Sequence, residues 1–244
     1  MTFENKTVIV SGGSRGIGRA IVEKFAREGA KVFFTYKSAA AAANELASLT
    51  GAAAIQCDQT DAVAIEKVAD DIFAQTGKID ILINNAGITK DGMFLMMPHA
   101  DWNAVLNTNL NGAFAWAKCV ARKMYSQKSG NIIFISSVSG LAGVAGQANY
   151  GASKAAVISL ARTLAAELGH KGIRVNAISP GFVETDMISK LPRDIAKQSR
   201  ERTALKRFGR PEEIAEIAAF LASDAASYIT GENIVADGGL SSGI

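Results

Sequence analysis

Short apolar runs alternate with longer segments of helical period along nearly the whole chain, and this alternation limits the possible folds more than any other feature. Several of the runs are apolar throughout and rich in Val, Ile and Phe, which is typical of strands that are covered on both faces of a sheet. We therefore predict strands at residues 7–11, 31–36, 53–58, 79–84, 131–136, 173–178 and 233–236.

Helical segments fill the intervals between these strands. We predict helices at residues 17–28, 39–49, 62–75, 101–127, 150–168 and 211–222. The last begins with Pro-Glu-Glu, which suits the first turn of a helix and the positive end of its dipole. Strands that alternate with helices in this way form βαβ units. The sequence therefore predicts an α/β fold, a Rossmann-type doubly wound domain whose seven-stranded parallel sheet has helices on both faces.

The chain shows no sign of division into two domains. Only four prolines occur in 244 residues, and no Pro/Ser-rich linker or low-complexity block interrupts the pattern. We therefore expect a single domain over residues 1–244. The least regular stretch, residues 181–209, follows a strand at the edge where open α/β sheets bind ligands, so we predict that it is a substrate lid.

Composition excludes several classes of protein. A net charge of +3, from 26 basic and 23 acidic residues, is too small to indicate a nucleic-acid surface. No apolar run precedes the first strand, so we expect neither a signal peptide nor a membrane anchor, and a cytoplasmic location. Cys57 and Cys119 fit no zinc spacing and are expected to be packed as small hydrophobes, while His99 and His170 are isolated. We therefore predict no metal site.

A glycine-rich loop directly follows the first predicted strand and precedes a helix. Its spacing is Gly-x-x-x-Gly-x-Gly, which differs from the Gly-x-Gly-x-x-Gly of the standard dinucleotide fingerprint. Glycine permits a tight turn and a close approach of the backbone, and a helix N-terminus attracts a pyrophosphate. The alternative is a strand-to-helix turn that serves packing only. The predicted cofactor contacts from this loop are Gly12, Ser14, Arg15, Gly16, Ile17 and Gly18.

The residues after the second strand favour NADPH over NADH. NAD-preferring domains usually place an acid there, whereas this chain has Thr-Tyr-Lys-Ser at residues 35–38. Lys37 and Arg15 are candidates to flank a 2′-phosphate, although both are also compatible with solvated surface charges. Asp58 and Gln59, after the third strand, are candidates to bind the adenine, although Asp58 is equally suited to cap the following turn.

Two side chains with complementary chemistry lie four residues apart near the start of the predicted helix 150–168. Tyr150 offers a phenol and Lys154 an ammonium, and this spacing places both on one helix face. A ketone that accepts hydride needs a proton at its oxygen, and a nearby cation lowers the pKa of a tyrosine toward the working range. Ser137, at the end of the fifth strand, is expected to orient the carbonyl. We prefer it to Ser136 because strand alternation directs the two hydroxyls to opposite faces.

Taken together, these motifs resemble the short-chain dehydrogenase/reductase family over essentially the whole chain. The resemblance also rests on Asn-Asn-Ala-Gly at residues 84–87 and Pro-Gly at 180–181. It implies that Asn109 holds a water that relays protons to Lys154. It further implies that the cofactor cleft is lined by Asn85, Ala86, Gly87, Pro180, Gly181, Val183 and Thr185, with Tyr150 and Lys154 contacting the cofactor as well as the substrate.

Within that family the chain is similar to the bacterial reductases that act on 3-oxoacyl thioesters of acyl carrier protein, through residues 84–91, 146–150, 180–187 and 228–232. This resemblance implies NADPH-dependent reduction to the 3-hydroxyacyl thioester, in fatty-acid or related polyketide or polyene synthesis. It also implies a homotetramer packed through its long helices and C-terminal segment. An acetoacetyl-CoA reductase, or another short-chain ketone reductase, would share the same catalytic residues. A cofactor-binding protein without turnover is the alternative from a different class.

Two further features bear on substrate and partner. Lys128, Lys171 and Arg174 are expected to lie near loops that border the site and to attract an acidic carrier protein, with plain surface charge as the alternative. The segment 93–97 is rich in methionine, and the related reductases commonly have a basic residue where Met96 stands. This loop suits either a bulky acyl chain or packing between subunits.

Overall fold

The computed structural model describes residues 2–185 and 193–242 and contains one seven-stranded parallel sheet in the order β3-β2-β1-β4-β5-β6-β7. The predicted α/β class is therefore confirmed, and each predicted strand is present with ends that differ by at most two residues. The strands are β1 (Thr7–Val10), β2 (Lys31–Tyr36), β3 (Ala53–Gln56), β4 (Ile81–Asn84), β5 (Gly130–Ile135), β6 (Ile173–Pro180) and β7 (Asn233–Ala236).

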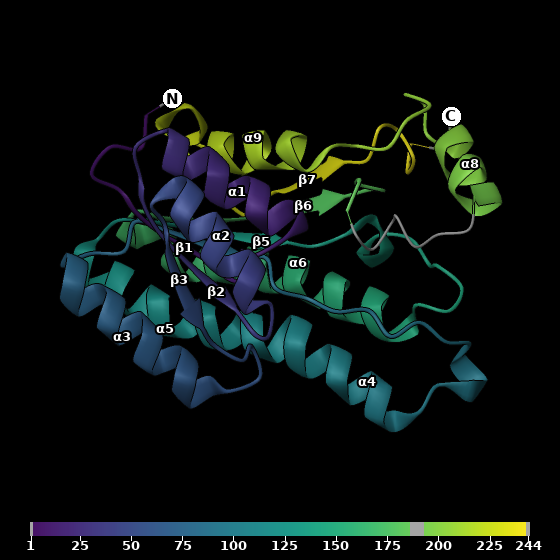
Figure 1. Cartoon of the computed structure of the whole chain (residues 1–244), viewed down its shortest axis with the longest axis horizontal. Helices are drawn as coiled ribbons and strands as arrows, with labels where there is room; N and C mark the ends of the chain where they lie inside the picture. Colours follow the sequence, from purple (N-terminus) through teal and green to yellow (C-terminus); the bar gives the residue numbers. More distant parts are fainter. Residues whose placement is uncertain (1, 186–192, 243–244) are drawn as a thin grey trace.

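Helices cover both faces of the sheet (Figure 1). The α-helices among the described residues are α1 (Gly16–Arg27), α2 (Ala40–Thr50), α3 (Ala62–Thr76), α4 (His99–Leu106), α5 (Gly112–Gln127), α6 (Ala148–Leu168), α8 (Arg193–Arg202) and α9 (Pro211–Ala222). Val8 and Val10 of β1 pack into one core cluster with residues of α1, α2 and α9, whereas Ile9 packs into a second cluster with residues of α3, α5 and α6. Alternate residues of one strand thus face opposite layers, which explains why the strands are apolar throughout.

Two predicted segments differ from what the structure shows. The single helix expected at 101–127 is divided into α4, a π-helical turn at Asn107–Asn111 and α5. The irregular stretch expected at 181–209 contains the helix α8, and its residues 186–192 lie outside the described part of the chain. The α8 sequence carries seven charged or amide side chains in ten residues. It therefore has too few apolar residues to show the periodic pattern from which a helix is predicted.

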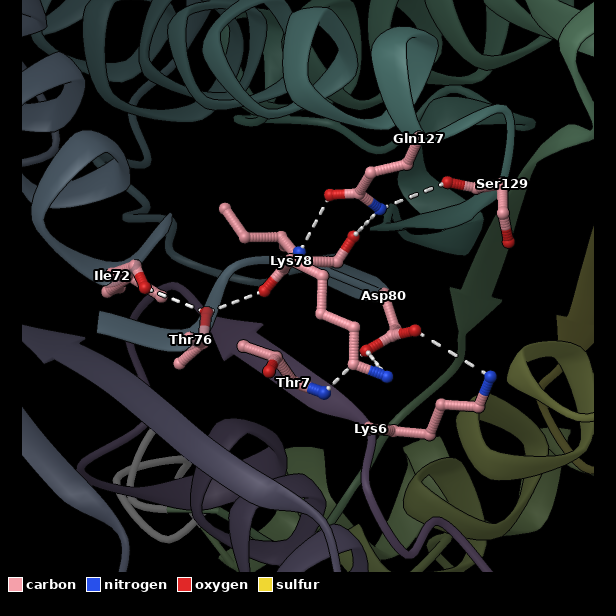
Figure 2. Close-up of polar contacts among 9 residues, drawn as sticks. Lys6, Thr7, Ile72, Thr76, Lys78, Asp80, Gln127 and Ser129 are labelled. Carbon is pink, nitrogen blue, oxygen red and sulfur yellow. Dashed lines mark hydrogen bonds and ion pairs between the residues drawn. The ribbon is translucent and has the colours of Figure 1, made fainter. Parts of the chain in front are cut away.

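Because all strands run parallel, their carboxyl ends share one edge of the sheet and their amino ends share the other. At the amino edge, polar side chains form hydrogen bonds and ion pairs with the backbone and with each other (Figure 2). Asp80 accepts a hydrogen bond from the Thr7 N–H at 2.8 Å, and Gln127 bonds the N–H and carbonyl of Ile79 at 2.9 and 3.0 Å. The carboxyl edge, where the glycine loop, Ser137 and the 180–185 segment emerge, is therefore the edge at which the candidate site lies.

A buried ion pair joins helices that are far apart in the sequence. Lys24 of α1 is only 8% exposed, and its ammonium contacts Glu28 and Glu216 of α9, each at 2.7 Å. Burial by itself lowers the pKa of Lys24, but the two carboxylates outweigh it and the pKa is raised. Losing the lysine would leave Glu28 largely buried without its cation.

We expect Lys24→Met to lower the free energy of unfolding by about 3 kcal/mol, since removing one partner leaves an uncompensated buried charge. The matched control is Lys67→Met, whose pair with Asp71 lies on the surface and should change stability far less. Urea unfolding followed by circular dichroism measures both. Equal stabilities of the two variants would contradict this account of how α1 and α9 are held together.

Candidate active site

The glycine loop is packed so closely that side chains are excluded from it. A Cβ at Gly18 would lie 2.2 Å from the Gly12 carbonyl oxygen and 2.5 Å from Asn85 Nδ2. Gly12 has a φ of +67°, and a Cβ there would lie 2.8 Å from the Ala86 Cα. The unusual glycine spacing thus reflects the contact of the helix start with both the loop and the segment after β4.

Polar side chains around this loop keep its backbone in place. Asn85 donates from Nδ2 to the carbonyls of Ser11 and Gly12 at 3.1 and 2.9 Å, and the Ser11 hydroxyl accepts from the N–H groups of Asn85 and Ala86. The Asn85 side chain, predicted to line the cofactor cleft, is therefore hydrogen-bonded to the backbone of the glycine loop and stabilises its conformation.

The amino end of α1 is open to an anion. Its first turn contains no acidic residue, and the residue before it, Arg15, makes no side-chain capping bond. Among the described residues no carboxylate pairs with Arg15, which is exposed, whereas Ser14 is buried and Ile17 half-buried. A helix start with free N–H groups, a cradle that a Cβ would fill and a nearby guanidinium together fit the pyrophosphate of a dinucleotide.

Lys37, predicted to bind the 2′-phosphate, and Asp58, predicted to bind the adenine, contact each other. Lys37 and Asp58 form an ion pair at 2.8 Å beyond the carboxyl ends of β2 and β3. This contact lowers the pKa of Asp58, and the Thr60 N–H bonded to the same carboxylate adds to the effect. Lys37 therefore lies where a 2′-phosphate was expected, already held by a carboxylate.

The side chain of Gln59, a predicted adenine contact, is turned into the core. Its side chain is buried and accepts a hydrogen bond from the Trp116 indole at 3.1 Å. A Cβ at Gly112 would lie 2.3 Å from the Gln59 carbonyl oxygen, so α5 packs directly against this residue. Any contact of Gln59 with the adenine would therefore come from its backbone, and position after a strand does not reveal the direction in which a side chain points.

The three catalytic candidates meet at the carboxyl edge beside the segment that follows β4. The Lys154 ammonium lies 5.6 Å from the centre of the Tyr150 ring and donates to the Ile135 carbonyl at 2.7 Å. The Ser137 hydroxyl lies close enough to the Tyr150 hydroxyl to lower its pKa, whereas the Ser136 hydroxyl is buried and donates to the Lys154 carbonyl at 2.8 Å. A Cβ at Gly87 would lie 3.5 Å from the Lys154 ammonium. The structure therefore places Ser137, and not Ser136, beside the phenol.

Burial shifts the pKa values of Tyr150 and Lys154 in opposite directions. Burial raises the pKa of Tyr150, the hydrogen bond from Ser137 opposes the rise, and the charge of Asp91 adds to it. Burial lowers the pKa of Lys154 to about 8. In the protein without ligand, burial and not Lys154 therefore dominates the pKa of Tyr150, and the predicted lowering of that pKa by a nearby cation stays a prediction for the complex with cofactor.

Asn109 lies in the π-helical turn between α4 and α5 and is buried. Its Oδ1 accepts from the Ile88 N–H at 2.8 Å, and its Nδ2 donates to the Ile88 carbonyl at 3.0 Å and the Ser153 hydroxyl at 3.1 Å. The side chain thus holds the segment after β4 against α6. Single π turns are frequent at functional sites because they displace the helical backbone from its regular pattern.

Sequence reasoning missed a row of polar side chains behind Ser137. The Ser137 hydroxyl accepts from the Ser139 N–H, the Ser139 hydroxyl donates to Gln147 Oε1 at 2.9 Å, and Gln147 Nε2 donates to Asp91 Oδ2 at 3.0 Å. Gln147 comes shortly before the Tyr-x-x-x-Lys motif, and this proximity was the only available signal. The row connects Ser137 to the segment after β4.

The predicted lid begins against the cofactor loop. Gly181 follows Pro180, the last residue of β6, and a Cβ there would lie 2.7 Å from Asp237. A Cβ at Gly16 would lie 3.2 Å from the Thr185 methyl, so Thr185 covers the start of α1. The Val183 side chain is buried in the core, which leaves only its backbone to meet a nicotinamide.

The basic residues proposed for carrier binding lie at the wrong edge for their own chain's site. Lys128 and Lys171 immediately precede β5 and β6, at the amino edge, whereas Ser137 follows β5 at the carboxyl edge. A six-residue strand spans about 20 Å. Arg174 is not available either, since its guanidinium donates to the carbonyls of Ile229 and Ser223. The expectation that these residues border the site is therefore wrong within one chain.

Within residues 2–185 and 193–242, no group of three or more His, Cys, Asp or Glu side chains is arranged to hold a metal ion. None of the helices in that part of the chain is long and apolar enough to cross a membrane.

A doubly wound sheet with a phosphate-binding glycine loop and a Ser-Tyr-Lys group at its carboxyl edge defines a dinucleotide-dependent oxidoreductase. A family model described as enoyl-(acyl carrier protein) reductase matches residues 12–241. The chain is 45% identical over 242 residues to the 3-oxoacyl-(acyl-carrier-protein) reductase FabG of Salmonella typhimurium and 44% identical over 242 residues to that of Escherichia coli K12. It is 42% identical over 244 residues to the reductase of the same name from Thermotoga maritima. Each comparison covers 98% of this chain and 99% of the relative.

The chain therefore belongs to the short-chain dehydrogenase/reductase family, as its motifs predicted, and is an oxidoreductase. Enzymes of this family use a nicotinamide cofactor, and the open start of α1 and the tight glycine cradle fit one.

We expect Gly18→Ala to weaken nicotinamide dinucleotide binding by about fivefold to a hundredfold, because overpacking costs about 1–3 kcal/mol and the new methyl displaces the loop and Asn85 together. Gly169→Ala is the control, since a Cβ at Gly169 would meet nothing within 4 Å. Isothermal titration calorimetry gives both dissociation constants. Unchanged binding in the Gly18 variant would contradict the assignment of this loop.

Proposed function

We propose that the chain reduces the ketone of a 3-oxoacyl thioester, carried on acyl carrier protein, to the 3-hydroxyacyl thioester with NADPH, in cytoplasmic fatty-acid or related polyketide or polyene synthesis. The observation that carries this proposal is the buried group of Ser137, Tyr150 and Lys154 beside the glycine loop. We further propose that residues 1–244 form one domain and that 181–209 is its substrate lid.

The arrangement of the three side chains suggests the role of each. When bound, the reduced nicotinamide supplies a hydride to the carbonyl carbon. Tyr150 donates its proton to the carbonyl oxygen, and the Ser137 hydroxyl bonds the same oxygen and orients the ketone. With a pKa of about 8, Lys154 is mostly an ammonium at neutral pH, and its charge stabilises the phenolate that remains. Asn109 holds the segment beside this group and is the proposed position for a relay water.

Two cations support NADPH as the reduced cofactor. Arg15 is exposed at the start of α1, and Lys37 lies beyond β2, where NAD-preferring domains carry an acid. A 2′-phosphate would compete with Asp58 for Lys37 and gain a second partner in Arg15.

A second candidate activity follows from the description of the family model, which names reduction of an enoyl thioester. In that reaction hydride and proton both go to carbon, so a serine placed to orient a ketone oxygen would have no evident purpose. The compared relatives are named as 3-oxoacyl reductases at 42–45% identity. We therefore favour the ketone over the enoyl thioester as the substrate.

Exposed apolar surface supports the proposed homotetramer. A groove of about 400 Å³ on the outer side of α5 and α6 is lined by Phe114, Tyr125 and Leu164 among others, with Arg122 and Glu167 at the same place. An antiparallel partner helix pair would bring these opposite charges together. Tyr228, fully exposed near β7, marks a second apolar region at the C-terminal segment.

Carrier binding by Lys128 and Lys171 is compatible with the fold only in such an assembly. Both lie at the amino edge, so they can guide a carrier to the site of a neighbouring chain and not to their own. Lys171 is also held over the Tyr125 ring at 4.6 Å, which fixes its position next to the α5–α6 groove.

The proposed activity is tested by NADPH oxidation with 3-oxobutyryl and 2-butenoyl groups, each on acyl carrier protein and on CoA, with NADH as the cofactor control. We expect turnover of the 3-oxobutyryl carrier substrate with NADPH. Preference for the CoA thioester would indicate an acetoacetyl-CoA reductase, and turnover of 2-butenoyl would indicate the enoyl activity. No turnover of any of these thioesters would contradict the proposed substrate class and favour another short-chain ketone.

In the same assay, Tyr150→Phe should lower kcat about a hundredfold to ten-thousandfold while dinucleotide binding persists, because only the proton donor is removed. Tyr228→Phe is the matched control and should behave as the wild type, because it removes a phenol hydroxyl outside the Ser137, Tyr150 and Lys154 group and keeps the apolar ring of the proposed subunit contact. Full activity of the Tyr150 variant would refute the assigned proton donor.

A further inference from the structure

Two connections at the carboxyl edge present apolar side chains to solvent, and we call these residues the apolar rim. Phe94, Leu95 and Met96 are 72%, 92% and 81% exposed on the connection between β4 and α4, and Met93 is also exposed. Leu141 and Val144 are exposed on the connection between β5 and α6. Exposed apolar residues gathered in this way usually mark a binding surface.

Hydrogen bonds join the two connections to each other. The Gly92 N–H donates to the Gly146 carbonyl at 2.8 Å, and Gln147 bonds Asp91 at 3.0 Å. Asn149, which is fully buried, donates to the Lys90 carbonyl at 2.9 Å. Both connections lie at the right-hand end of the molecule in Figure 1, below α8. The rim is therefore one surface made of two segments.

The rim is also joined to the proposed catalytic group. The row from Ser137 through Ser139 and Gln147 ends on Asp91, two residues before Met93. Asp91 in turn raises the pKa of Tyr150, so its carboxylate lies near the phenol. A substrate whose carbonyl is held by Ser137 and Tyr150 would thus have its reacting end on the same side as Asp91, where the segment that carries the rim begins.

We propose that the apolar rim binds the hydrocarbon tail of the thioester substrate and makes this chain selective for acyl groups of medium or greater length. The inference rests on the proposed reduction of a 3-oxoacyl thioester. Residues 92–98 carry no charge, which suits a hydrocarbon and not the acidic surface of a carrier protein. Methionine adapts its shape to flexible apolar ligands. A second copy of the chain seated on the rim would cover the entrance beside Ser137.

The expected effect grows with chain length. Burying one methylene contributes enough to change an equilibrium constant about three- to fourfold. We therefore expect kcat/KM to rise steeply from 3-oxobutyryl to 3-oxodecanoyl thioesters of N-acetylcysteamine, a carrier fragment that lacks the protein. Phe94→Ser combined with Met96→Ser should lower the ratio of kcat/KM for the decanoyl to the butyryl substrate about tenfold or more.

Leu49→Ser is the matched control, because Leu49 is similarly exposed but lies near the end of α2, at the amino edge. This variant should leave the ratio as in the wild type. A flat dependence on chain length in the wild type, with normal turnover of 3-oxobutyryl, would overturn the rim proposal and leave the proposed function intact. Absence of all turnover would instead count against the proposed function.

A binding measurement tests the rim independently of turnover. Saturated decanoyl and butyryl thioesters of N-acetylcysteamine have no ketone to reduce, and calorimetry in the presence of NADP⁺ reports their affinities. We expect the double variant to lose about tenfold in affinity for the decanoyl compound relative to the butyryl one. Equal loss for both lengths would overturn the proposal. So would light scattering that shows the double variant to dissociate into smaller oligomers, since the rim would then be a contact between copies.

Discussion

The close contact of Gly18 with the Gly12 carbonyl and Asn85 is the constraint on which the rest of the site depends. With no side chain at either glycine, the start of α1 lies against both the loop after β1 and the segment after β4. That segment continues to Gly87 and Ile88, which contact Lys154 and Asn109. The lack of a side chain at these glycines therefore brings the positive end of the α1 dipole close to the segment that packs beside the proposed catalytic group.

Burial also shifts the pKa values of two neighbouring groups, Tyr150 and Lys154. It raises the pKa of the Tyr150 phenol and lowers that of the Lys154 ammonium, because both charged forms lose water. Because the Tyr150 phenol retains its proton, it can act as a proton donor. The Lys154 ammonium, with a pKa of about 8, can exchange protons near neutral pH. The polar row behind Ser137 connects this pair to the apolar rim, so proton transfer and recognition of the hydrocarbon tail share one support.

The fold was largely predictable because apolar strands covered on both faces have a strong local pattern. The catalytic candidates were predictable from motif spacing, since Tyr150 and Lys154 are four residues apart on one helix. The direction of side chains was not predictable: Gln59 turns into the core toward Trp116, and Arg174 is engaged by carbonyls of the chain near β7. The π-helical turn around Asn109 also has no local signal, and its contact with Ile88 joins residues that are 21 positions apart in the sequence.

Protonation of Tyr150 in the free protein is the most direct test of this account. Tyrosine labelled with ¹³C at the ring carbon that bears the hydroxyl reports ionisation by NMR, and Tyr150→Phe assigns the signal. The account predicts that Tyr150 keeps its proton at least up to about pH 10, the ordinary value for tyrosine. Ionisation of Tyr150 below about pH 8 would show that a nearby cation, and not burial, controls the phenol, and would contradict the account.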